Sequence, residues 1–213
     1  MKELSVERIA RPLSHDEAAA LLDEATAHRI ACVNWPDSYP YMPEVAFSVL
    51  HDGDTIYLRY TVEESSVAAV APHDNGQVWL DSCVEMFCSF DGSGYYNLEA
   101  NAAGQVLLSY RVPGGDKVMA DSSVLAAVGR YPSLGREPFA ERVGQTRWSL
   151  MLTIPKEAFF RNGIESLCGA EATANFYKCG DNLQTPHFVS WSPIDNPKPN
   201  FHLPQYFGKV RFM

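Results

Sequence analysis

Polar side chains alternate with apolar ones along two consecutive stretches of the chain, residues 79–90 and 95–101. Because successive side chains of a strand point to opposite faces, one face of the first stretch is expected to be core, with Val84, Met86, Cys88 and Phe90. The other face carries polar groups in both stretches, namely Asp81, Cys83 and Glu85, then Tyr95, Asn97, Glu99 and Asn101. The DGSG segment between the stretches is typical of a hairpin loop, which would set these polar faces side by side. Such a surface either faces solvent or binds a hydrogen-bonding ligand.

The elements that would position this surface are mainly strands. Only residues 15–29 have a helical pattern, introduced by a capping box of Ser14 and Glu17. After Arg29, runs rich in β-branched and aromatic residues are separated by turn residues; they are 30–35, 44–50, 55–62, the two stretches above, 105–112, 148–154, 173–180, 188–191 and 209–212. About ten short strands predict an all-β fold, an antiparallel β-sandwich of the immunoglobulin-like or jelly-roll type with one N-terminal helix.

The chain is expected to form a single domain over residues 1–213, with residues 1–30 as an N-terminal helical extension. No repeat or linker divides it. Residues 113–145 are the least regular part and predict a long excursion at one end of the fold. Near the C-terminus the segment SPIDNPKPNFHLPQYFG is rich in proline, which predicts an extended, stiff loop.

Composition argues against several classes of partner. The formal net charge is −9 and lysine and arginine form no cluster, so nucleic acid is not expected as a partner. No apolar run is long enough to span a bilayer, so no membrane partner is expected. The N-terminus lacks the apolar region of a secretory signal, and the location stays open: cytoplasmic as numbered, or secreted or periplasmic if a signal was removed.

The five cysteines do not follow the pattern of a disulfide framework or a zinc ribbon, since their number is odd and no C-x-x-C pair occurs. Cys83 and Cys88 should point to opposite faces of one strand and cannot bridge. Small buried or half-buried thiols are the favoured interpretation.

Several motifs in this order resemble those of the family 9 carbohydrate-binding modules and their stand-alone relatives. They are a tryptophan before a V-E-x-F strand, the YYNLEAN strand, the W-x-L-x-x-x-I-P run ending at Pro155, FYKCGD, and SWSPI with FHLPQYFG near the C-terminus. The similarity covers about residues 33–212. It implies a β-sandwich that binds sugars non-catalytically, in carbohydrate catabolism, with a separate glycoside hydrolase as a candidate partner. The resemblance requires no cofactor, although members of the family often carry structural calcium.

The resemblance also assigns residues. Trp79 and Phe201 correspond to two aromatic platforms around a sugar ring, and Glu85 matches a hydrogen-bonding glutamate. Two positions depart from the family pattern: Phe201 replaces a tryptophan, and Glu99 stands where a basic residue is expected. The complete set expected to bind carbohydrate is Trp79, Asp81, Glu85, Asn97, Glu99, Asn101, Lys178, Phe201 and His202.

A sugar presents C–H groups on its faces and hydroxyls around its rim, so it needs aromatic rings for stacking and polar side chains in one plane. The set above supplies both, for a mono- or oligosaccharide or the end of a polysaccharide chain. The competing interpretation places Trp79 in the core and the carboxylates on a solvated face. Trp191, beside Val189, is more typical of packing than of a third platform.

Other kinds of site were considered. Glu85 and Glu99 on adjacent strands could form the carboxylate pair of a glycoside hydrolase, although a regular sheet face crowded with polar groups does not favour it. A haem would need histidine or methionine axial ligands, and no spacing singles out such a pair. Turns at Asp52, Asp54 and Asp91 could hold calcium, but ordinary turn roles are favoured.

Overall fold

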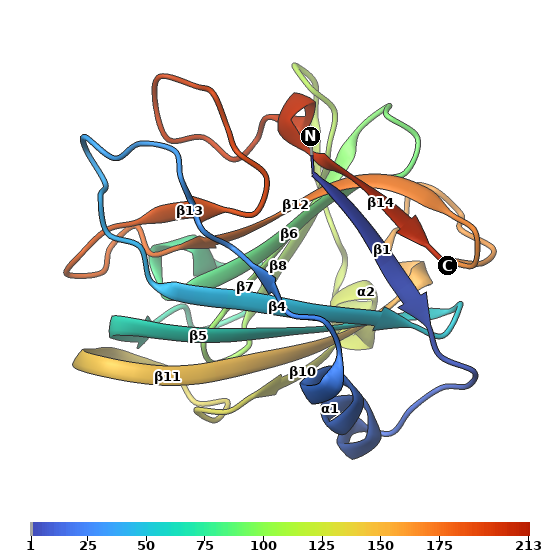
Figure 1. The fold of residues 1–213 in the computed structure, drawn as a ribbon, viewed down its shortest axis with the longest axis horizontal. Helices are drawn as coiled ribbons and strands as arrows, with labels where there is room; N and C mark the ends of the chain where they lie inside the picture. Colours follow the sequence, from blue (N-terminus) through green and yellow to red (C-terminus); the bar gives the residue numbers. More distant parts are fainter. Residues whose placement is uncertain (1) are drawn as a thin grey trace.

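The computed structural model of the protein describes residues 2–213, and strands are its main regular element (Figure 1). Its strands form one fourteen-stranded sheet within the described residues. One half of the sheet contains β2 (His28–Arg29), β4 (Glu44–His51), β5 (Thr55–Ala69), β10 (Gly129–Pro132) and β11 (Phe139–Pro155). The other half contains β3 (Cys32–Val33), β6 (Cys83–Ser89), β7 (Tyr95–Asn101), β8 (Val106–Arg111), β9 (Lys117–Met119), β12 (Glu171–Cys179), β13 (Phe188–Ser190) and β14 (Gly208–Phe212).

Strand β1 (Glu3–Arg8) joins the two halves. Its first residues pair in parallel with β14, from Glu3 opposite Lys209 to Val6 opposite Phe212, and Glu7 and Arg8 then pair in parallel with β4. The expectation of a purely antiparallel fold is therefore wrong, because the sheet is mixed. Residues 1–30 are also not simply a helical extension. Strand β1 buries only Leu4 and Val6, too short an alternation to stand out in the sequence.

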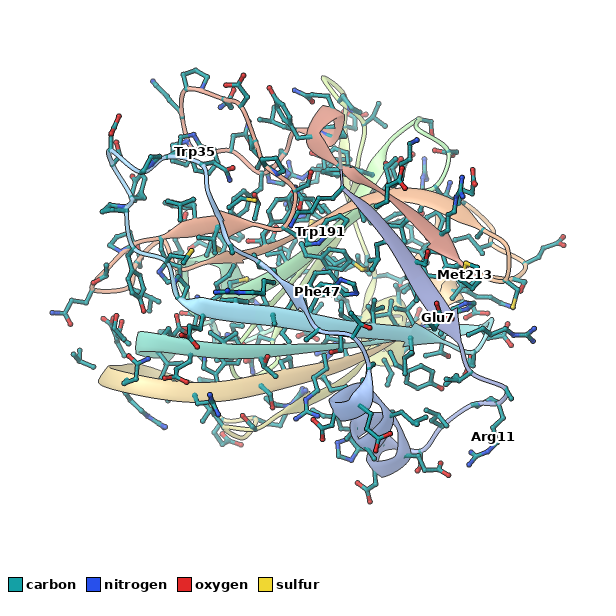
Figure 2. The ribbon with its side chains drawn as sticks, in the orientation of Figure 1. Glu7, Arg11, Trp35, Phe47, Trp191 and Met213 are labelled. Atoms are coloured by element: carbon teal, nitrogen blue, oxygen red, sulfur yellow. The ribbon has the colours of Figure 1, made fainter. Side chains whose placement is uncertain are left out.

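The main core lies where β4 and β5 of one half face β6 and β12 of the other. Phe47 on β4 stacks on Phe176 of β12 with ring centroids 3.8 Å apart, and Trp191 packs edge-on against Phe47 at 6.2 Å (Figure 2). The buried Tyr60 hydroxyl on β5 donates to the Glu85 carbonyl on β6. Trp191 is thus a packing residue, as the sequence favoured.

The predicted parity of β6 is confirmed. Val84, Met86 and Cys88 are buried in this core, and Phe90 packs against it. Cys83 lies on the opposite face, which separates it from Cys88 as expected. All five cysteines are free thiols.

Helix α1 (His15–Glu24) begins at the predicted capping box, in which the Glu17 amide donates to the Ser14 side chain and the Ser14 amide donates to the Glu17 carboxylate. Its buried residues Ala18 and Leu22 pack against β4, β5 and β11. No helix in residues 2–213 combines the length and apolar character that crossing a bilayer requires.

Residues 113–145 are more regular than predicted. They contain β9, a second helix α2 (Ser122–Ala127) capped by Asp121, strand β10 and the start of β11. Helix α2 is too short to show a helical period, and residues 140–145 of β11 are all exposed, so no apolar alternation marks them. The single N-terminal helix that the sequence predicted is therefore an undercount.

Replacing Phe176 by alanine should cost about 3–5 kcal/mol of unfolding free energy, because it removes a buried ring that joins the two halves. Val143→Ala is the control, since Val143 is 71% exposed and its truncation should change stability by less than about 0.5 kcal/mol. Urea denaturation measures both values. A loss below about 1 kcal/mol for Phe176→Ala would contradict this account of the core.

Candidate functional site

The polar face of β6 and β7 does not face water. Glu85 and Glu99 are 3% and 4% exposed, and Asn97 and Asn101 are fully buried. The alternative in which these carboxylates lie on a solvated face therefore does not hold. The physical reason is that two loops, one before β4 and the proline-rich one after β13, cover this face together with the short helix η1 (Val78–Leu80).

The proline-rich loop is anchored by specific contacts. Trp35 Nε1 donates to the Asn196 carbonyl at 2.7 Å, which ties the two covering loops together. The Tyr177 hydroxyl on β12 donates to the Phe201 carbonyl at 3.2 Å, and the two rings stack with centroids 4.2 Å apart. The short helix η3 (Pro204–Tyr206) then leads the chain into β14. These contacts hold Phe201 and His202 over the sheet.

Between the loop and the sheet lies a pocket of about 240 Å³. Its walls include five of the residues expected to bind sugar: Trp79, Glu85, Glu99, Phe201 and His202. Trp79 is only half-buried, so the alternative in which it is sealed in the core does not hold. The structure thus brings both expected aromatic platforms and both glutamates to one cavity.

The other expected residues do not line the pocket. Asp81 accepts hydrogen bonds from the Ala71 amide and the Asn101 side chain, both at 2.9 Å. Asn101 in turn accepts from the backbone amides of Ala103 and Gln105 in the turn after β7. These two side chains therefore shape the strand ends instead of facing a ligand.

Asn97 lies behind Glu99 and holds it, since Asn97 Nδ2 donates to Glu99 Oε1 at 2.7 Å. Ser109 Oγ and Arg111 Nε both donate to the Asn97 oxygen, the latter at 3.3 Å. Asn97 thus connects a pocket glutamate to a pocket arginine.

Lys178 points away from the pocket into a buried network. Its Nζ lies 2.9 Å from Glu64 Oε2 and donates to His187 Nε2 and the Cys179 carbonyl, both at 2.7 Å. Trp148 Nε1 donates to the other Glu64 oxygen at 2.7 Å. Burial and then the charge of Lys178 lower the pKa of His187 to about 3, so this imidazole is neutral at pH 7. The family resemblance assigned Lys178 to the sugar site, because the family has a polar side chain at this position, but here that side chain contacts Glu64 and His187 and does not line the pocket.

Sequence reasoning missed several pocket residues: Phe87, Leu107, Arg111, Lys117, Cys179, Asp181, Phe188, Pro199 and Asn200. The parity of β6 could have found Phe87, since it follows Glu85 by two positions. Lys117 lies on β9, a strand that the sequence did not predict. Arg111 ends β8 and pairs with Tyr95. No local pattern marks the remaining residues as neighbours.

Burial governs the charges in the pocket. It raises the pKa of Glu99 to about 7 and of Asp181 to about 6, and burial followed by the charge of Glu99 holds the pKa of Glu85 well above its usual range. Burial, then Arg111 and Lys117, lowers the pKa of His202 to about 4. Near pH 7 the Glu85 carboxyl and the His202 imidazole are therefore neutral, Glu99 is divided between its two forms, and Asp181 is mostly ionised. The pocket offers both hydrogen-bond donors and acceptors.

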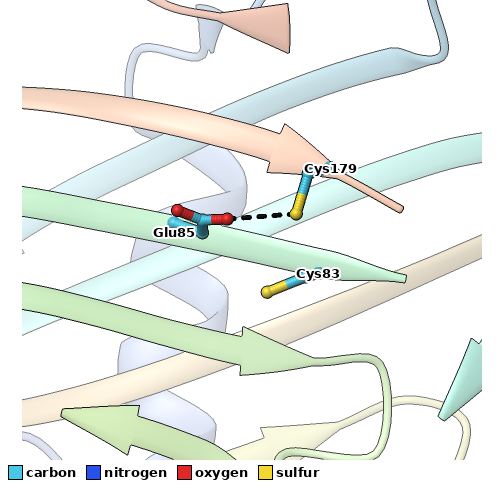
Figure 3. A group of neighbouring side chains, drawn as sticks. All are labelled: Cys83, Glu85 and Cys179. Atoms are coloured by element: carbon cyan, nitrogen blue, oxygen red, sulfur yellow. Dashed lines mark hydrogen bonds between the residues drawn. The ribbon is translucent and has the colours of Figure 1, made fainter. Parts of the chain in front are cut away.

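The carboxylates of the acidic turns contact groups of the chain itself. Asp52 accepts from the Asp54 and Thr55 amides, Asp54 pairs with Lys156, and Asp91 accepts from Ser93. Calcium prefers six to eight oxygen ligands. Within residues 2–213 the one group of three or more histidine, cysteine or acidic side chains near enough to share a metal ion is Cys83, Glu85 and Cys179 (Figure 3). The two thiols of this group do not suit calcium. Structural calcium in this protein stays an untested prediction.

Comparison with known proteins places this geometry in a family. Residues 16–212 match the family model described as carbohydrate-binding family 9. A search of curated proteins gives no match.

Solved structures extend the comparison. A protein from Bacteroides uniformis, described as a candidate carbohydrate-binding protein, is 45% identical, with a TM-score of 0.96 over 100% of this chain and 99% of its own. A family 9 module from Caldicellulosiruptor kristjanssonii in complex with glucose is 13% identical, with a TM-score of 0.58 over 100% of this chain and 96% of its own. The same type of module from that organism with cellotriose is also 13% identical, with a TM-score of 0.59 over 99% and 93% of the two chains. The last two establish a shared fold.

Replacing Lys178 by methionine should cost about 3–5 kcal/mol of unfolding free energy, because it leaves the Glu64 carboxylate buried without its cation. The double variant Glu64→Gln with Lys178→Met should recover much of that loss, since it removes both charges. Chemical denaturation of the two single variants and the double variant measures the coupling. Additive losses would show that the pair is not coupled.

Proposed function

The chain belongs to carbohydrate-binding family 9, and we propose that its pocket binds one sugar ring, free or at the end of a chain, without breaking a bond. The observation that carries the proposal is the convergence of aromatic rings and carboxyl groups on one cavity. At about 240 Å³, the pocket is smaller than the roughly 300–1,000 Å³ typical of drug-sized ligands, which favours a single ring.

In this proposal Trp79 and Phe201 contact the C–H faces of the ring. Aromatic rings of this kind contribute a large apolar area, and the polar edge of the indole can stay near water. Phe201 is fixed by its stack on Tyr177, so little side-chain freedom is lost when a sugar binds. The single ring of Phe201 offers less area than a tryptophan would, so we expect modest affinity.

Glu85, Glu99 and Asp181 would contact hydroxyl groups around the rim of the ring. A protonated carboxyl such as that of Glu85 both donates and accepts, an ionised carboxylate accepts, and a hydroxyl can pair with either. Hydrogen bonds in a water-poor pocket are also stronger than at a surface. Arg111 and Lys117 add cationic donors at the same cavity, which compensates for the glutamate at position 99 where the family pattern has a basic residue. The glucose and cellotriose bound to the two Caldicellulosiruptor modules support a glucose-type ring as the first ligand to test.

The proposal extends to the fold and the biological context. The two halves of the sheet, packed through Phe47 and Phe176, support a β-sandwich, and residues 1–213 form one domain in this view. A carbohydrate-binding domain in carbohydrate catabolism would act beside a separate glycoside hydrolase.

Hydrolysis by this chain is not part of the proposal. Glu85 and Glu99 lie directly opposite each other across β6 and β7, as a carboxylate pair would. A glycosidase, however, needs one ionised carboxylate beside one protonated acid. Here the pKa of Glu99 is about 7 and that of Glu85 lies well above its usual range, so the carboxyl groups alone do not decide against such a pair. The match to carbohydrate-binding family 9 is what favours binding without hydrolysis.

Trp79→Ala and Glu85→Ala should each abolish measurable binding of glucose and cello-oligosaccharides. The first removes an aromatic ring that would stack on the sugar, and the second removes a carboxyl group that would contact its hydroxyls. Tyr131→Ala is the matched control, since Tyr131 is an exposed aromatic residue that does not line the pocket. Calorimetric titration after a glycan array measures the affinities, and circular dichroism confirms that the variants are folded. Retained binding in both pocket variants would refute the site.

A reducing-sugar release assay should find no product above background from the wild-type protein on any glycan that binds. If sugar is released, and release is lost in Glu85→Gln or Glu99→Gln, the chain is a hydrolase and the non-catalytic proposal fails.

A further inference from the structure

Two thiols and a carboxyl group lie close together at the pocket, where Glu85 and Cys179 are part of the wall and Cys83 lies beside them. Cys83 on β6 lies directly opposite Cys179 on β12, and Glu85 follows Cys83 on the same face of β6 (Figure 3). The two sulfur atoms and a Glu85 oxygen all lie within 4.8 Å of one another, and the Cys179 thiol donates to Glu85 Oε1 at 3.1 Å. All three residues are buried.

We propose that Cys83, Cys179 and Glu85 bind a divalent ion of the zinc class. Thiolate sulfur together with one carboxylate oxygen is a donor set that suits Zn²⁺, whereas Ca²⁺ and Mg²⁺ select oxygen ligands. Three ligands from the chain leave a fourth tetrahedral position. Asp181 lines the same pocket, so its carboxylate or a water molecule can complete the shell.

Binding balances as an exchange of protons for the metal. The ion forms two metal–sulfur bonds and one metal–oxygen bond, and two thiol protons and one carboxyl proton leave to solvent. No oxidant or reductant takes part. Zinc affinity should therefore fall as the pH is lowered.

Arg111 and Lys117 line the same pocket and supply positive charge there. The closest buried ammonium, Lys178, is occupied by Glu64 and His187 on the other side of β12. Glu99, opposite Glu85, is 4% exposed. Its Oε1 atom accepts from Asn97, and its Oε2 atom has no hydrogen-bond partner. The two thiols and the Glu85 carboxyl lie close enough together to share one divalent ion. Glu85 and Cys179 line the pocket, which gives the ion a path of entry.

This inference shares Glu85 and Asp181 with the sugar proposal, but it depends on the thiols of Cys83 and Cys179, which the sugar proposal does not use, and its test contains no sugar. Either proposal can therefore fail while the other stands.

Cobalt(II) is the probe, because a tetrahedral thiolate site gives it sulfur-to-metal charge-transfer and intense visible bands. Full-length protein, kept reduced with a phosphine and freed of metal by a chelator, is titrated with Co²⁺ and then with Zn²⁺. We expect one Co²⁺ per chain with both sets of bands, displacement by Zn²⁺, no displacement by Ca²⁺, and a higher melting temperature with Zn²⁺. Cys83→Ser and Cys179→Ser should lower the affinity by more than about 100-fold.

Cys168→Ser and Cys32→Ser are matched controls on half-buried thiols outside the pocket, and they should bind like wild type. Should the pocket variants fail to fold, unchanged bands in Cys32→Ser, Cys88→Ser and Cys168→Ser assign the ligands to Cys83 and Cys179 by elimination. Absence of thiolate bands in the wild-type protein overturns the proposal, as does equal binding by folded Cys83→Ser and Cys179→Ser.

Discussion

The burial of carboxyl groups beneath a proline-rich loop is the constraint on which the rest of this structure depends. Glu85 and Glu99 lie on a sheet face that would be solvated in an open sheet, yet the loop through Phe201 covers it. Desolvation then raises the pKa of both acids, limits the ligands that the pocket can accept, and strengthens each hydrogen bond that a ligand makes there. The same burial gives the thiols of Cys83 and Cys179 their separation from water.

Two devices support that loop. Proline fixes the backbone of the segment and cannot extend the sheet, so the chain crosses the strands instead of pairing with them. The stack of Phe201 on Tyr177 and the hydrogen bond from Trp35 to Asn196 then hold the loop against the sheet. On the side of β12 away from the pocket, the ion pair of Glu64 and Lys178 holds the end of this strand in place. Cys179 and Asp181, which line the pocket, lie at and just after that end. A buried ion pair of this kind is better evidence for a single, specific packing arrangement than for net stability.

Local sequence patterns predicted a large part of this architecture. Strand parity placed Val84, Met86 and Cys88 in the core and Glu85 on the other face, because alternation on a strand depends only on the neighbouring residues. Strands with little apolar alternation, such as β1 and β9, gave no such signal. The pairing of β1 with both β14 and β4 joins residues far apart in the chain, and no local pattern predicts that contact.

For the pocket, parity and family likeness indicated Glu85, Glu99, Trp79 and Phe201, whose side chains do meet. Parity could not show that Asp81 and Asn101 accept hydrogen bonds from nearby backbone amides. The sequence pattern is the same whether a polar side chain contacts a ligand or a turn. Nor could it show that a loop distant in sequence would cover the face.

The most direct test of the account is a crystal structure of the protein soaked with glucose. We predict density for one sugar ring in the pocket, in contact with Trp79 and Phe201 and within hydrogen-bonding distance of Glu85 and Glu99. A ring bound instead in the groove over β4, β5 and β11, beside Arg59 and Arg147, with the pocket empty, would contradict the account.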